Sequence, residues 1–192
     1  WRRTQPLYDP MCGSGTFPIE AALIGQEIPP GILRKHFTFQ KWENFDNDIW
    51  KNLIEIAKNE IKNYDLRISG YDSIKKNIQL SIENAKKIQV NEYIRFKSKN
   101  INQFNPSENG GVILINPPYG HRLGVVNELE KLYKLIGDIL KTNCTNNDAF
   151  IFTGNLNLAK FIGLRSKKRT ILKNGTIDCR LLHFPIKTGK YA

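Results

Sequence analysis

The stretch Leu7-Tyr8-Asp9-Pro10-Met11-Cys12-Gly13-Ser14-Gly15-Thr16 decides the fold of this chain of 192 residues. Its pattern predicts the end of a strand, a glycine-rich loop and the start of a helix that has Ile19, Ala22 and Leu23 on one face. Pro18 falls in the first turn of that helix, where a missing N–H does no harm. A strand, a glycine loop and a helix in this order are typical of nucleotide-cofactor sites.

The glycine loop favours one class of cofactor. It is not a phosphate-binding P-loop, because no Gly-Lys-Ser/Thr follows, and Phe17 and Pro18 break the dinucleotide pattern Gly-x-Gly-x-x-Gly. An acidic strand tip followed by Gly-x-Gly suits S-adenosylmethionine (SAM), since Gly13 and Gly15 let the backbone approach the cofactor closely. Asp9 would favour the cationic sulfonium end or fix the loop. A plain turn is the alternative interpretation.

A second motif, Asn116-Pro117-Pro118-Tyr119, follows the apolar run of residues 112–115. It places an amide, a rigid backbone and a flat ring at the end of a buried strand. This combination suits the binding of a planar amino group, such as the exocyclic nitrogen of a nucleobase. The prolines alone would make the motif a mere strand terminator. Together with the glycine loop, it indicates an amino-methyltransferase.

The length and composition of the chain limit which folds and which kinds of site are possible. The length predicts one domain, and no apolar run approaches the length of a membrane span. Three cysteines without C-x-x-C spacing and three scattered histidines argue against disulfides, a zinc site or another metal cluster, and favour a reducing cytoplasm. Because the chain begins at Trp1, we expect a fragment of a longer protein. The net charge of +11 favours a nucleic-acid partner, or reflects only a composition rich in Lys, Asn and Ile.

Strand and helix patterns alternate along the chain and then give way to a hairpin. The expected helices are 46–63, 73–87 and 127–141, and the expected strands are 67–71, 93–97, 112–115 and 149–152. Strands 169–173 and 176–185 should pair through a turn at Asn174-Gly175. The predicted fold is therefore α/β, with a Rossmann-like, mostly parallel sheet that ends in an antiparallel hairpin, as in class I SAM methyltransferases. Residues 26–45 are expected to pack as an irregular insertion.

Several motifs together resemble the catalytic domain of the bacterial 23S rRNA guanine-N2 methyltransferases. They are Asp9-Pro-Met-Cys-Gly-Ser-Gly-Thr16, Ile19-Glu-Ala-Ala22, Ile28-Pro-Pro-Gly31, Phe39-Gln-Lys-Trp42, Asn116-Pro-Pro-Tyr-Gly120, Arg122-Leu-Gly124 and Lys173-Asn-Gly175 with Asp178-Cys179. The resemblance covers essentially the whole chain. It implies that residues 1–192 form a SAM-dependent methyltransferase domain that follows a THUMP RNA-binding domain, absent here, in a cytoplasmic enzyme.

The resemblance also implies roles for individual residues. The SAM site would comprise Asp9, Met11, Cys12, Gly13, Ser14, Gly15, Thr16, Asp72, Ser73, Asn100, Ile101 and Asn116. Asp72 would bind the ribose hydroxyls, as a carboxylate at a strand tip is expected to do, or would serve only as a helix cap. Asn100 and Ile101 would flank the adenine, and Asn100 stands where relatives usually have Asp.

The expected reaction is a direct displacement in which a guanine N2 amine takes the methyl group. Asn116, Pro117, Pro118 and Tyr119 would form the catalytic motif, with Asn116 Oδ1 and the Pro117 carbonyl accepting the amine hydrogens. Tyr119 would stack on the flipped-out base. The expected nucleic-acid contacts are Tyr119, His121, Arg122, Arg165, Lys167, Lys168 and Arg169, although the last cluster also fits a solvated surface. His121 stands where relatives often have Glu.

Three other functions fit the same motifs. The first is methylation of adenine N6 in DNA, and the second is methylation of guanine N2 in tRNA, because both use the same tetrapeptide. The third is a non-catalytic RNA-binding module that retains the SAM fold. The intact residues Asp9, Gly13, Gly15 and Asn116 argue against the third. The expected partner is RNA, with 23S rRNA as the expected substrate.

Overall fold

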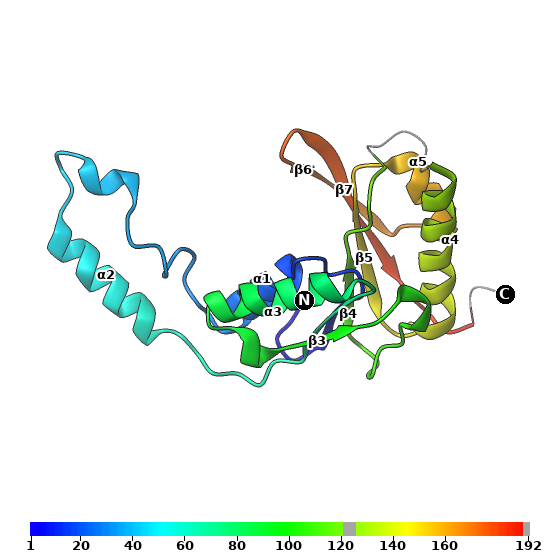
Figure 1. Cartoon of the computed structure of the whole chain (residues 1–192), viewed down its shortest axis with the longest axis horizontal. Helices are drawn as coiled ribbons and strands as arrows, with labels where there is room; N and C mark the ends of the chain where they lie inside the picture. Colours follow the sequence, from blue (N-terminus) through cyan, green and yellow to red (C-terminus); the bar gives the residue numbers. More distant parts are fainter. Residues whose placement is uncertain (121–125, 190–192) are drawn as a thin grey trace.

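A computed structural model describes residues 1–120 and 126–189. Its centre is a seven-stranded sheet with the order β3-β2-β1-β4-β5-β7-β6 (Figure 1). The strands are β1 (Leu7–Asp9), β2 (Ile68–Asp72), β3 (Ile94–Ser98), β4 (Val112–Ile115), β5 (Asp148–Thr153), β6 (Lys168–Asn174) and β7 (Ile177–Pro185). Strands β3 to β5 in this order are parallel, whereas β7 runs antiparallel to both β5 and β6. The α/β fold with a C-terminal antiparallel hairpin is confirmed.

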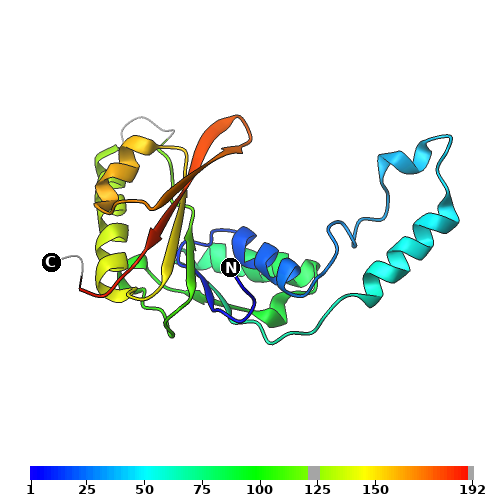
Figure 2. The same ribbon diagram turned by 180° about the vertical axis from the view of Figure 1, so that it is seen from behind.

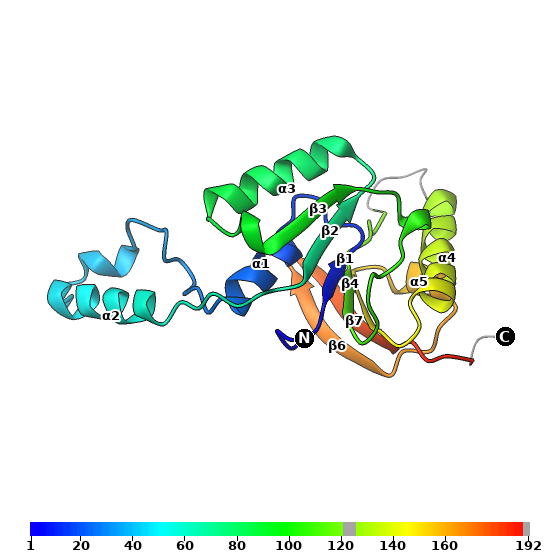
Figure 3. The same ribbon diagram turned by 90° about the horizontal axis from the view of Figure 1, so that it is seen from below.

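Helices cover both faces of the sheet (Figure 3). The α-helices are α1 (Thr16–Gly25), α2 (Asn47–Asn59), α3 (Lys75–Lys87), α4 (Val126–Asn143) and α5 (Leu156–Ala159). Short 3-10 turns are η1 (Thr38–Lys41), η2 (Asn91–Tyr93), η3 (Ile101–Gln103) and η4 (Lys160–Ile162). In the part of the chain that the structure describes, no helix is long and apolar enough to cross a bilayer.

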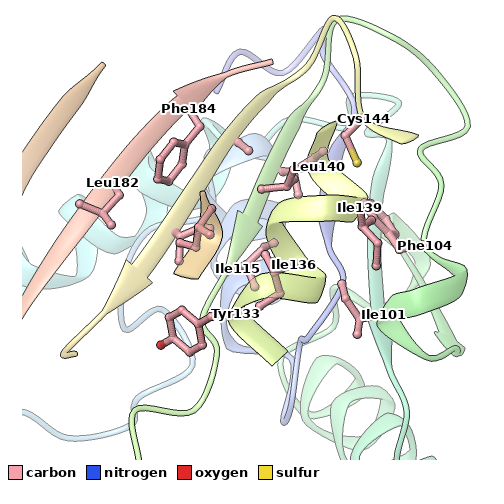
Figure 4. Packing of buried hydrophobic residues seen from close by; sticks show 14 of the residues in the cluster. Ile101, Phe104, Ile115, Tyr133, Ile136, Ile139, Leu140, Cys144, Leu182 and Phe184 are labelled. Carbon is pink, nitrogen blue, oxygen red and sulfur yellow. The ribbon is translucent and has the colours of Figure 1, made fainter. Parts of the chain in front are cut away.

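Adjacent residues of β1 face the two layers, because successive side chains of a strand point to opposite sides. Leu7 belongs to the buried cluster that includes Ile19 of α1 and Ala85 of α3. Tyr8 belongs to the larger cluster built around α4. In that cluster, Tyr133, Ile136 and other α4 side chains pack against Ile115 of β4 and against Leu182 and Phe184 of β7 (Figure 4). The sheet is thus held from both faces, which leaves its carboxyl edge free to form a site.

Several element boundaries depart from the predicted ones by one to four residues, and contacts in the structure explain three of these departures. Helix α2 ends at Asn59 instead of residue 63, because the Lys62 N–H donates to Gln26 O at 2.8 Å and draws the chain back to the body. Helix α3 starts at Lys75 instead of residue 73, because Asp72 Oδ1 accepts from the Ile74 N–H at 2.8 Å and holds that residue in an extended conformation.

The hairpin turn also lies one residue later than predicted. Asn174 still pairs with Ile177 within the ladder, so the two-residue loop is Gly175-Thr176. Gly175 has a φ of +60°. A glycine with positive φ at the first loop position is typical of the type II′ hairpin turn. This one-residue shift makes Asn174 the last residue of β6.

Residues 27–64 form an arm that stands away from the sheet (Figures 1 and 2). The predicted irregular insertion at residues 26–45 contains one 3-10 turn, η1, and no other helix or strand, and beyond Gln26 none of its residues is buried. Helix α2, which follows it, has no buried residue either. Its apolar side chains Ile49, Leu53 and Ile56 are exposed. The aromatic side chains of the arm contact one another instead, for example Phe39 and Trp50 at 5.1 Å between ring centroids. The arm is therefore a small unit attached at its base.

Candidate active site

The three predicted site segments meet at the carboxyl edge of the sheet. Residues 9–16 begin at the last residue of β1, residues 72–73 begin at the last residue of β2 and residues 116–119 follow β4. Strand β1 pairs with both β2 and β4. The helices after β1 and β4 pack on opposite faces of the sheet. This point, where the strand order reverses, is where open α/β sheets bind ligands.

The two glycines of the loop have different functions. Gly15 has a φ of +86°, and a Cβ there would lie 3.0 Å from Ser81 Cβ and 3.2 Å from Phe96 Cζ, so Gly15 allows tight packing. Gly13 has a φ of +54°, and a Cβ there would meet nothing within 4 Å. Its surface therefore faces open space, which is what close approach of a cofactor requires. The loop is anchored from below, because Ser81 Oγ donates to Gly13 O at 2.8 Å.

Asp72 connects the glycine loop to the beginning of α3. Its Oδ2 accepts from the Gly13 N–H at 3.1 Å. Its Oδ1 accepts from the Ile74 N–H and from Asn77 Nδ2, at 2.8 Å and 3.2 Å. Both carboxylate oxygens thus have structural partners. Asp72 is not the cap of α3, because Ile74 is the N-cap residue and no described side chain accepts from the N–H groups of the first helical turn. The role of Asp72 in ribose binding remains a prediction.

Two cavities of about 410 Å³ and 400 Å³ lie along this edge, and Met11 lines both. We call them the outer cavity and the inner cavity. The outer cavity is lined by Pro10, Met11, Asp72, Ser73, Asn100, Ile101, Glu128, Lys131, Leu132 and Leu135. The inner cavity is lined by Asp9, Met11, Cys12, Gly13, Ser14, Thr16, Phe17, Asn116, Phe152 and Asn174. Every residue predicted for the cofactor lines one of the two, except Gly15, and each volume suits part of a small molecule.

The Asn-Pro-Pro-Tyr motif borders the inner cavity and is held by the surrounding fold. The Tyr119 hydroxyl donates to Asn116 Oδ1 at 2.6 Å. The motif backbone is fixed from behind, since the Tyr133 hydroxyl donates to Pro118 O at 3.3 Å and Asn155 Nδ2 donates to Tyr119 O at 3.0 Å. A rigid backbone thus positions the Asn116 amide, which is predicted to bind an amine. The acceptor oxygen of this amide already accepts a hydrogen bond from the Tyr119 hydroxyl.

Burial dominates the electrostatics of the site. Burial raises the pKa of Asp9 to about 8, against a hydrogen bond from the Met11 N–H that lowers it and with a smaller contribution from the nearby charge of Asp72. Burial also raises the pKa of Cys12 to about 12 and that of Tyr119 to about 12. At neutral pH the Cys12 thiol is therefore protonated and is no nucleophile. The Tyr119 phenol keeps its proton, so it acts as a donor and not as a base.

The basic residues predicted for nucleic-acid binding are not brought to the cavities. Arg165, Lys167, Lys168 and Arg169 are exposed, before and at the start of the edge strand β6. Lys168 pairs with His183 of β7, which in turn pairs with Phe150 in the middle of β5. Lys168 therefore lies away from the carboxyl edge of the sheet, where the two cavities are. These basic side chains could contact only a substrate large enough to extend beyond the cavities. His121 and Arg122 lie outside the described residues.

Several lining residues were not predicted. Phe17, Phe152 and Asn174 complete the inner cavity, and Glu128 and Lys131 of α4 complete the outer one. Phe17 follows the glycine loop directly and could have been found from its position. The others come from distant segments and carry no local signal. Within the described ranges, no group of three or more His, Cys, Asp or Glu side chains is placed to hold a metal ion.

Comparisons with known proteins agree with this geometry. Residues 1–183 match the family model UPF0020, described as RMKL-like, methyltransferase domain. The chain is 39% identical over 97% of its length to slr0064 of Synechocystis sp., provisionally named an RNA methyltransferase. It is 39% identical over 96% of its length to the ribosomal RNA large subunit methyltransferase K/L of Syntrophotalea carbinolica. It spans 49% and 27% of these two relatives.

A solved structure has the same fold over nearly the whole chain. SMU.472, provisionally named a methyltransferase, was crystallised with SAH and superimposes with a TM-score of 0.90 at 29% identity. The match covers 99% of this chain and 50% of SMU.472.

Proposed function

Because the chain belongs to the family of RMKL-like methyltransferase domains, we propose that it transfers a methyl group from SAM to the N2 amine of a guanine in ribosomal RNA. SAM is the cofactor, in line with the SAH bound to the similar SMU.472 and with the open surface above Gly13. When bound, SAM supplies an electrophilic methyl group. RNA as the substrate is supported by the names of the relatives and by the net charge of +11.

One observation carries the proposal: the glycine loop and Asn116 of the Asn-Pro-Pro-Tyr motif line the same cavity. Gly13, Ser14 and Asn116 share the inner cavity, so an amine bound to Asn116 would lie beside the cofactor loop. Asn116 Oδ1 and the Pro117 carbonyl would accept the amine hydrogens and localise its lone pair on nitrogen. Orientation and fixed dipoles then contribute most of the acceleration, and no strong base is needed. Tyr119 would stack on the base, worth about 1–3 kcal/mol.

We propose that the two cavities bind different parts of the cofactor. Asp72, Ser73, Asn100 and Ile101 of the outer cavity would hold the adenosine part of SAM. The loop residues and Asp9 of the inner cavity would hold its methionine part. In the whole protein, we propose that a THUMP domain adds affinity for RNA and that the enzyme acts in the cytoplasm, where ribosomal RNA is modified.

The test is methyl transfer from labelled SAM to unmodified rRNA, tRNA and DNA, followed by nucleoside analysis. The expected product is N2-methylguanosine in rRNA. Label in tRNA guanine or in DNA N6-adenine would replace the proposed substrate by one of the two alternatives. SAM and RNA binding without any transfer would favour the non-catalytic module.

The catalytic assignment of Asn116 is tested by Asn116→Ala. We expect kcat to fall by about 10²–10³, the loss typical of a preorganised polar group, with SAM affinity nearly unchanged. Asn157→Ala is the matched control, since Asn157 is exposed on α5 and lines neither cavity. Near-normal turnover by Asn116→Ala would show that the motif is only a strand terminator.

A further inference from the structure

The β6–β7 hairpin brings a second amide, that of Asn174, to the inner cavity. Arg180 of β7 pairs with Thr153, the last residue of β5, so the hairpin tip beyond Arg180 extends past the carboxyl edge of the sheet (Figure 1). Asn174 lies in this tip and lines the inner cavity together with Asn116 and Phe152. Its side chain is exposed, so it is not needed to fill the core.

The Tyr119 hydroxyl connects the two amides. It donates its proton to Asn116 Oδ1 at 2.6 Å. Burial raises the pKa of Tyr119 to about 12, Cys179 also raises it, and hydrogen bonding with the Asn174 side chain lowers it. A phenolic hydroxyl has one proton, so its bond with Asn174 must be accepted by the oxygen and donated by the Asn174 amide N–H. The cavity therefore presents an acceptor at Asn116 and a donor at Asn174, with a hydroxyl between them.

This pair of groups is complementary to the edge of an aminopurine. Such an edge carries an exocyclic amine, which donates, next to a ring nitrogen, which accepts; in guanine these are N2 and N3. We propose that Asn174 is a base-binding residue of the methyl-transfer site. Before the substrate binds, the Tyr119 hydroxyl occupies the hydrogen-bonding positions at Asn116 and Asn174 that the base edge takes in the complex. The amine then takes Asn116 Oδ1, the ring nitrogen takes the Asn174 N–H, and Tyr119 is released to stack. The proposal rests on the proposed function, since it assumes that an amino base is the substrate.

The first test compares Asn174→Ala and Asn174→Asp with Thr176→Ala, an exposed control in the turn of the same hairpin. We expect both Asn174 variants to raise KM for RNA about 3- to 10-fold, the loss of one neutral hydrogen bond, with KM for SAM and Tm unchanged. Asp has the shape of Asn but lacks the amide N–H. If Asn174→Asp behaves as wild type, or Asn174→Ala matches Thr176→Ala, the proposal is overturned.

The second test separates binding of the base from support of Tyr119. Tyr119→Phe keeps the ring but removes the hydroxyl that competes for both amides, so KM for RNA should stay the same or fall. Tyr119→Ala loses stacking, and KM should rise. Asn174→Ala should retain its effect in the Tyr119→Phe background. If that effect disappears there, Asn174 acts only through the Tyr119 hydroxyl and is not a base-binding residue.

A binding readout makes the result independent of turnover. The dissociation constant of a labelled guanine-containing RNA, measured by fluorescence anisotropy with SAH present, should rise in Asn174→Ala by the same factor as KM. Equal RNA affinity in wild type and Asn174→Ala would overturn the inference while leaving methyl transfer intact. Failure of the wild-type protein to methylate any nucleic acid would instead overturn the proposed function.

Discussion

At the scale of single residues, the two glycines of the loop differ in what a side chain would meet. Gly15 is surrounded by Ser81, Ile19 and Phe96, whereas the space above Gly13 is open. A substitution at Gly15 should therefore damage packing. One at Gly13 should fill the space that the cofactor needs.

Gly13→Val should abolish SAM binding measured by calorimetry. Both the branched side chain and the backbone strain at a φ of +54° act at the loop surface. Gly110→Val is the matched control, because Gly110 has a φ of +75°, also has nothing within 4 Å of a Cβ, and lines neither cavity. The control should lose comparable stability and keep SAM affinity. Unchanged SAM affinity in Gly13→Val would contradict the cofactor assignment.

Asp72→Ala should weaken SAM binding by about 1.5–3 kcal/mol, the range for a hydrogen bond to a charged group. It should also lower Tm, because the Gly13 N–H and the Ile74 N–H lose their acceptor. Asp72→Asn keeps one oxygen and should recover part of the stability but less of the SAM affinity. If Tm falls and calorimetry finds SAM affinity intact in both variants, Asp72 only stabilises the loop and does not bind the cofactor.

The raised pKa of Asp9 predicts that the free energy of unfolding depends on pH. Its pKa is raised from the ordinary value of 3.8 to about 8 by burial, so between these values the native state holds a proton that the unfolded state has lost. The stability from this proton is complete below about pH 4 and is lost as pH rises through about 8. Urea unfolding from pH 5 to 9 should show a declining free energy of unfolding. Asp9→Asn, which mimics the neutral acid, should reduce that decline, and an equal decline in both proteins would refute the assignment.

At the scale of elements, the arm depends on one buried glutamine at its base. Gln26 is fully buried. Its Nε2 donates to Tyr64 O and its Oε1 accepts from the Tyr64 N–H, both at 2.7 Å. The Lys62 N–H adds a bond to Gln26 O at 2.8 Å. These bonds join the two ends of the arm and explain why α2 can stand away without packing on the sheet.

Gln26→Ala should lower the free energy of unfolding by about 1–3 kcal/mol, because it leaves backbone groups of Tyr64 without partners. Limited proteolysis should then cut sooner around residues 60–64. Gln40→Ala is the control, since Gln40 Oε1 also accepts a backbone N–H, that of Phe37 at 2.7 Å, but within the arm itself. The idea fails if both variants unfold at the same urea concentration as wild type.

At the scale of the whole molecule, the net charge of +11 should make RNA affinity strongly dependent on salt. The triple change Lys167→Ala, Lys168→Ala and Arg169→Ala should reduce the slope of log affinity against log salt by about 2, if each residue contacts a phosphate of single-stranded RNA. A triple change of Lys76, Lys86 and Lys87, exposed at α3, is the control of equal charge. Equal slopes in the two variants would show that residues 167–169 form only a solvated surface.

The sequence by itself determined the type and order of the elements and the two motifs at the centre of the site. The glycine loop and the Asn-Pro-Pro-Tyr segment could be predicted from the sequence, because each requires particular residue types, such as glycine or proline, at adjacent positions. Such signals are local, and backbone conformation and side-chain period act over a few residues.

Only the tertiary structure decided which distant residues share a cavity. Asn174 reaches the inner cavity because the hairpin turn falls at Gly175-Thr176 and the ladder of β7 extends past β5. Glu128 reaches the outer cavity because α4 packs on the face opposite α1. The same register leaves Lys168 of the edge strand β6 level with the middle of β5, away from the carboxyl edge, and the bond between Lys62 and Gln26 ends α2 early. These outcomes depend on strand register and packing between segments far apart in the chain, for which local sequence patterns carry no signal.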